Sequence, residues 1–123
     1  MPTRPSASIL QATLGLSVLL YAFDAQAHAR LLKSDPATDA KVSAPKLIHL
    51  QFSETLAKKF SSFRLSDAEG HAVALTAVDS KDPKVLEAAP VAALAPGRYT
   101  ISWTSAASDD GHRMTGHYSF TVQ

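Results

Sequence analysis

Apolar and polar side chains alternate in three separate stretches of the chain. In residues 47–52, an isoleucine, a leucine and a phenylalanine alternate with a histidine and a glutamine. The same period of two recurs in residues 99–103 and 118–122. Because successive side chains of a strand point to opposite faces, the pattern predicts strands with one buried face. Weaker strand patterns occupy residues 29–32, 62–66, 72–77 and 85–88.

Turn-forming pairs such as Asp35-Pro36 and Pro96-Gly97 separate these stretches. The alanine-rich residues 88–95 have helix propensity, but the proline inside them and the proline after them argue against a helix. A short helical turn is expected within residues 54–60. About seven short strands therefore predict an all-β protein, a Greek-key sandwich or barrel.

The first 27 residues have the layout of a secretory signal peptide. Arg4 precedes an apolar run over residues 9–22, and Ala25-Gln26-Ala27 then provides a small-x-small cleavage site. The alternative is a membrane anchor, but a spanning helix needs ~20 apolar residues, and this run is shorter and partly polar. We expect cleavage after Ala27, export to the periplasm, and one domain over residues 28–123.

Composition narrows the chemistry. The chain contains no cysteine, which excludes disulfides, thiolate metal ligands and cysteine nucleophiles together. The net charge is +1 and no basic block occurs, so the electrostatic footprint of a nucleic-acid-binding protein is missing. No nucleophile elbow or comparable catalytic motif is present.

His28 would become the N-terminal residue after cleavage. An N-terminal histidine offers two nitrogen donors, its α-amine and ring Nδ1, which can close a chelate on one metal ion. Their ordinary pKa values of about 8 and 6.5 let a metal displace both protons at neutral pH. Two nitrogens in a rigid bite suit a tetragonal Cu(II) centre. The alternative is that His28 is simply the residue that follows the cut.

Two further motifs carry candidate ligands. Asp110 and His112 are separated by Gly111, so an extended backbone would project both side chains to the same side. The alternative is a plain Asp-Gly turn before the last strand. Glu54, at the end of a predicted strand, is either an axial or outer oxygen of a metal site or an acid that begins a helical turn. His49, His71 and His117 are expected at the surface.

A series of motifs runs in a fixed order along residues 28–123. They are His28 followed by Lys33-Ser34-Asp35-Pro36-Ala37, then Phe52-Ser53-Glu54, Asp82-Pro83-Lys84, Leu94-Ala95-Pro96-Gly97-Arg98-Tyr99, Asp110-Gly111-His112 and Thr115-Gly116-His117-Tyr118. In this series the chain resembles the periplasmic copper-binding proteins of the CopC/PcoC copper-resistance family.

The resemblance implies a small Greek-key β-barrel of the cupredoxin or immunoglobulin-like kind. It also implies that one Cu(II) ion is held by His28, Asp110, His112 and Glu54. The implied role is a monomeric, non-enzymatic copper buffer or carrier, with an inner-membrane copper transporter of the CopD type as its delivery partner. Some members carry a methionine-rich loop for Cu(I), but Met114 is the single methionine after residue 27, so we expect a Cu(II)-only type.

Two other classes of function remain open on the sequence. A copper ion held by a histidine brace can also activate oxygen, which would make the protein a monooxygenase-like redox enzyme. A metal-free β-sandwich interaction module is the third class, and it leaves the placement of the histidines unexplained.

Overall fold

The computed structural model describes residue 3 and residues 28–123, and in this part of the chain it contains nine strands and one 3₁₀ helix. In order they are β1 (Leu31–Asp35), β2 (Lys41–Val42), β3 (Ile48–Phe52), η1 (Lys58–Phe60), β4 (Ser62–Ser66), β5 (Ala72–Val73), β6 (Leu75–Val78), β7 (Val85–Pro90), β8 (Gly97–Ala106) and β9 (Arg113–Val122). The predicted signal peptide, residues 1–27, lies outside the described residues apart from Thr3. No helix within the described part is long and apolar enough to cross a membrane.

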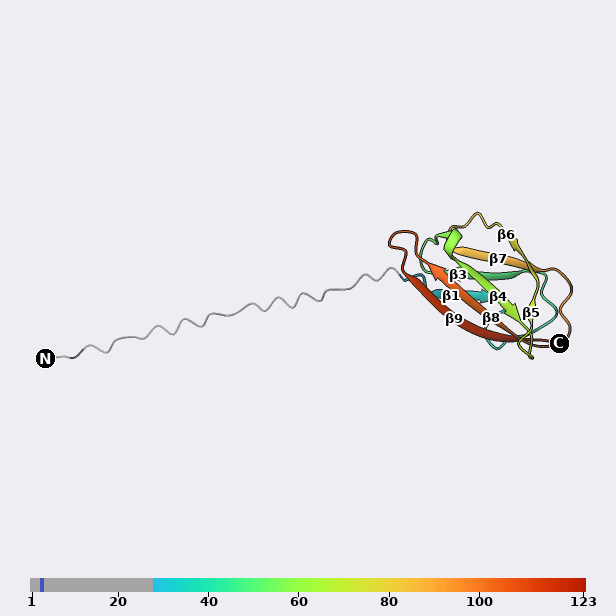
Figure 1. Ribbon diagram of the computed structural model, residues 1–123. Helices are drawn as coiled ribbons and strands as arrows, with labels where there is room; N and C mark the ends of the chain where they lie inside the picture. Colours follow the sequence, from blue (N-terminus) through green and yellow to red (C-terminus); the bar gives the residue numbers. More distant parts are fainter. Residues whose placement is uncertain (1–2, 4–27) are drawn as a thin grey trace.

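The strands form two sheets packed face to face (Figure 1). One sheet has the order β1-β3-β7-β6, and the other has the order β2-β9-β8-β4-β5. The chain passes from sheet to sheet several times, and β2 joins β9 in parallel whereas the other named strand pairs are antiparallel. The predicted all-β, Greek-key-like sandwich is therefore confirmed. Seven strands have at least four residues, and the two further strands, β2 and β5, have two residues each.

The core is built from the alternation seen in the sequence. Ile48, Leu50 and Phe52 of β3 are fully buried, and so are Ile101 of β8 and Phe120 of β9. These inward faces of the two sheets meet and remove their side chains from water, which is the main stabilising contribution in a protein without disulfides. The helical turn expected within residues 54–60 is the single-turn η1, and residues 91–96 contain no helix.

The longest element is the hairpin of β8 and β9, two ten-residue strands paired from Gly97 with Val122 to Ala106 with Arg113. Gly116 stands opposite Trp103, whose indole lies across it. A Cβ atom at Gly116 would overlap Cζ2 of that ring and lie 2.6 Å from Cε2. The indole also packs edge-on against Phe52 of the other sheet, with ring centroids 5.3 Å apart. Glycine is therefore required at this position by the close approach of Trp103.

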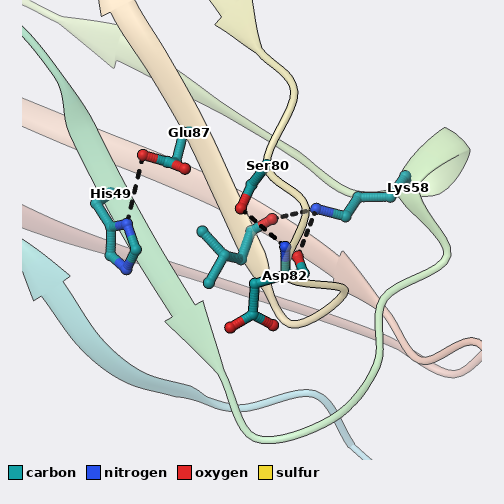
Figure 2. Close-up of polar contacts among 6 residues, drawn as sticks. His49, Lys58, Ser80, Asp82 and Glu87 are labelled. Carbon is teal, nitrogen blue, oxygen red and sulfur yellow. Dashed lines mark hydrogen bonds and ion pairs between the residues drawn. The ribbon is translucent and has the colours of Figure 1, made fainter.

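Polar contacts fix the connections around the first sheet (Figure 2). The ammonium group of Lys58 in η1 donates hydrogen bonds to the carbonyls of Asp82, at 3.2 Å, and Val85. These bonds tie η1 to the connection between β6 and β7. On the outer face of the sheet, Nδ1 of His49 lies 3.5 Å from a carboxylate oxygen of Glu87, its neighbour on β7. His49 is thus half-buried in a cross-strand pair.

Candidate metal centre

The connection between β8 and β9, residues 107–112, is closed by its own backbone. The Gly111 amide donates to the carbonyl of Ala107 at 3.0 Å, and the Ala107 amide donates to the carbonyl of His112 at 3.1 Å. Gly111 has a φ of 70°, a conformation that costs glycine little and most other residues more. This tight turn places Asp110 and His112 together at one end of the sandwich. The backbone here is the Asp-Gly turn named above as the alternative, and not the extended segment from which the shared direction of the two side chains is predicted. The turn itself nevertheless brings the two side chains together.

Asp110 and His112 form a closely bonded pair. One carboxylate oxygen lies 2.7 Å from Nδ1 of the His112 ring, and the other accepts the His112 backbone amide at 3.0 Å. The side-chain hydrogen bond to Asp110 raises the pKa of His112 above its ordinary value of 6.5. The same bond lowers the pKa of the Asp110 carboxyl. With Nδ1 facing Asp110, Nε2 of His112 is the ring nitrogen directed to another partner.

Hydrogen bonds from two serines hold the backbone of residues 28–30, just before β1. The hydroxyl of Ser53 accepts the amide of Arg30 at 2.9 Å and donates to the carbonyl of His28 at 3.0 Å. The Ser53 amide donates to the carbonyl of Arg30 at 2.8 Å. Ala29 between them is fully buried, and its carbonyl accepts the hydroxyl of Ser105 at 2.5 Å. His28 therefore starts from a fixed backbone.

This anchoring brings His28 to the hairpin connection. The His28 and His112 rings stack with centroids 5.4 Å apart and planes inclined by 24°. In Figure 1 the described chain begins beside the connection between β8 and β9. Two residues 84 positions apart in the sequence thus meet, one leading into the first sheet and the other within the second.

Glu54 belongs to a neighbouring segment, but its carboxylate is not joined to the other three candidates. The carbonyl of Thr55 accepts the amide of Ser108 at 2.9 Å, and Leu56 forms a bridge with Ala107. These bonds bring the backbone after β3 against the hairpin connection. Glu54 is half-buried and forms no hydrogen bond or ion pair within residues 28–123. Nor do three metal-ligating side chains converge anywhere in the part of the chain that is described.

Sequence patterns missed the two serines that position His28. Ser53 lies inside a motif noted for its glutamate, and nothing local indicates a contact with residues 28–30. Ser105 did carry a signal, because it occupies an inward position in the alternation of β8, where a buried hydroxyl needs a hydrogen-bond partner.

The donor set at this end of the sandwich suits a borderline metal ion. Two imidazoles and a carboxylate supply nitrogen and oxygen donors, which favour Cu(II), Ni(II) or Zn(II) over soft or hard ions. In the uncut chain the nitrogen of His28 is a peptide nitrogen, so the α-amine donor exists only after cleavage before that residue.

Comparison with known proteins agrees with this fold. The CopC domain family matches residues 31–123. Copper resistance protein C of Escherichia coli is 39% identical over 114 residues, which cover 86% of this chain and 90% of that protein. The crystal structure of PcoC, a methionine-rich copper resistance protein from Escherichia coli, superposes with a TM-score of 0.72 at 38% identity, covering 79% of this chain and all of that one. CopC from Methylosinus trichosporium OB3b gives a TM-score of 0.71 at 33% identity, covering 78% and 94%.

The fold and these comparisons thus define a small β-sandwich of the copper-resistance class. The chain belongs to the CopC family.

The Asp110–His112 bond leads to a measurable expectation in the metal-free protein. Asp110→Asn removes the negative charge that favours the protonated ring, so the pKa of His112 should fall toward 6.5. The measurement is an NMR titration of the His112 ring protons. Asp109→Asn is the matched control, because Asp109 contributes the smallest of the interactions that raise the pKa of His112. An equal fall in both variants would show that general negative charge, not the hydrogen bond, raises the pKa.

Proposed function

We propose that the protein is exported to the periplasm, begins at His28 after cleavage, and binds one Cu(II) ion to buffer or deliver copper. The donors in this proposal are the α-amine and ring of His28, the ring of His112 and the carboxylate of Asp110. The observation that carries it is the stacking of His28 on His112, which brings two imidazoles together from distant parts of the chain. Membership in a family of copper resistance proteins supports copper as the metal.

The oxidation state follows from the ligand chemistry. Thiolates and thioethers select Cu(I), whereas imidazole, amine and carboxylate donors suit Cu(II). The chain has no cysteine and two methionines, one of which is Met1. The other, Met114, is half-buried against the hydrophobic core. In contrast to the methionine-rich PcoC, this protein therefore lacks the donors for a thioether site and is proposed as a Cu(II)-only carrier.

Glu54 has a smaller role in this proposal. Its backbone lies against the hairpin connection, so a change of its side-chain rotamer could bring an oxygen toward the metal. We assign it as an outer oxygen rather than one of the nitrogen-rich equatorial donors. A monomer that passes copper to an inner-membrane transporter of the CopD type completes the proposal.

The test is Cu(II) titration of the protein starting at His28, with electron paramagnetic resonance of the loaded form. Loss of an outer partner of a ligand typically weakens metal binding by about 10–100-fold, so loss of a ligand in His112→Ala should weaken it by at least about a hundredfold. The axial signal should also lose nitrogen hyperfine coupling. His117→Ala, which removes an exposed histidine from β9, is the matched control and should leave both unchanged. Equal affinities of the two variants would contradict the proposal.

The same loaded protein tests the histidine-brace alternative. A copper carrier should consume oxygen no faster than free copper when ascorbate is added. Sustained oxygen consumption that disappears in His112→Ala would instead assign a redox enzyme.

A further inference from the structure

The outer face of the five-stranded sheet has a composition that the copper site does not explain. Three adjacent strands, β4, β8 and β9, run side by side across this face (Figure 1). Their register places two rows of outward side chains beside one another. One row contains Ser62, Thr104 and Thr115, and the other contains Arg64, Ser102 and His117.

These six side chains line a shallow dish of about 520 Å³. Trp103 and Gly116 lie between the two rows, and because the indole packs inward against Phe52, their backbone forms the floor. Four of the lining side chains are short hydroxyl groups. The two long side chains, Arg64 and His117, flank Ser102 in the same row. The nitrogen donors of the dish therefore lie along one of its edges.

The dish carries the positive charge of Arg64, and no acidic side chain of its own strands offsets that charge. None of β4, β8 and β9 contains an aspartate or a glutamate. Elsewhere on these strands, Arg98 lies 3.9 Å from Asp39, and Arg113 lies over the ring of Phe60. Arg64 and His117, by contrast, form no ion pair with any residue of 28–123. The two donors that flank Ser102 thus point to a negatively charged ligand from outside the chain.

We propose that this dish binds a small tetrahedral oxyanion such as inorganic phosphate or sulfate. The planar guanidinium of Arg64 can donate two parallel hydrogen bonds to such a group, and the hydroxyls of Ser102 and Thr104 can donate to its remaining oxygens. A neutral sugar fits less well, because the dish has no carboxylate acceptor and Trp103 is 8% exposed, too little for a stacking platform. A nucleic acid fits less well, because the net charge of the chain is +1 and a single arginine lines the dish.

The experiment titrates the metal-free protein with inorganic phosphate at constant ionic strength, and amide NMR shifts of the lining residues report on occupancy. We expect saturable shifts at Ser102 and Thr104. Arg64→Gln should weaken binding at least tenfold. Arg98→Gln, which removes a cation from the same face outside the dish, should leave it unchanged.

Three results would overturn the assignment. One is an equal response to sodium chloride, which would indicate general ion screening. Another is equal weakening by Arg64→Gln and Arg98→Gln, which would indicate diffuse charge. The third is a set of amide shifts confined to residues 107–112, which would place the anion at the other site. Unchanged circular dichroism verifies the fold of Arg64→Gln, and His117→Gln provides a second variant expected to weaken binding. Because copper is absent throughout, failure here leaves the copper proposal untouched.

Discussion

Adding a single glycine in front of His28 should lower the Cu(II) affinity of the exported protein about a hundredfold or more, which corresponds to ~2.7 kcal/mol. The added residue converts the proposed amine donor into a peptide nitrogen and moves the free α-amine one residue away from the ring of His28. It leaves the imidazole of His28 and the whole His112–Asp110 pair in place. Competition with a chelator of known affinity measures the change, and isothermal titration gives the stoichiometry.

The matched control is the same glycine added after Gln123, which alters length and composition equally but lies away from His28. It should bind Cu(II) like the unmodified protein. If the two extended proteins bind with equal affinity, the amine is not a donor and the site is a simple histidine pair. A full-length chain with residues 1–27 attached should behave like the N-terminally extended form.

The second large effect is expected at Gly116. Gly116→Ala introduces a Cβ 2.6 Å from Cε2 of Trp103 and 3.0 Å from Nε1, and the same ring packs edge-on against Phe52. Since an indole is rigid, either the ring or the hairpin must move. Overpacking of this kind typically costs about 1–3 kcal/mol of unfolding free energy. Urea denaturation followed by circular dichroism measures it.

A double-mutant cycle with Trp103→Phe separates overpacking from other effects of the alanine. The smaller ring alone leaves a cavity and destabilises the protein. In its presence, however, Gly116→Ala should cost much less than in the parent, because the atoms it would strike are gone. Additive losses in the two single variants would show that the contact is not the cause.

The strands could be predicted from local sequence patterns because each long strand buries one face in the core. Residues 62–66 were predicted with the bounds that β4 has, and the three clear alternations fall in β3, β8 and β9. The first strand begins at Leu31, two residues later than predicted, because residues 28–30 are held by serine hydroxyls and not by strand pairing. Strands β2 and β5 have two residues each, too few for a period of two to be recognised.

The site was predictable in part for a related reason. Asp110 and His112 are two residues apart, so the turn alone brings them together, and the sequence carries that information directly. The stacking of His28 on His112 depends on Ser53, just after β3, and on Ser105 of β8, which contact the N-terminal segment from far along the chain. No spacing rule contains such contacts. His28 is a candidate through its position after the cleavage site, and the full ligand set follows from resemblance to a family. The resemblance does not by itself bring the Glu54 side chain into the site, since its carboxylate remains apart from His28, Asp110 and His112.

The meeting of His28 and His112 has a consequence for the chain as a polymer. A metal ion held by both residues would close a loop of about 84 residues. It would also link the N-terminal segment of the first sheet to the β8–β9 hairpin of the second sheet. Because the ion would bind the folded chain and not the unfolded one, loading would stabilise the fold by about 2.7 kcal/mol at a free copper concentration of about 100 times Kd. A protein without cysteine would thus gain a reversible crosslink each time it is loaded, and would lose that crosslink whenever its cargo leaves.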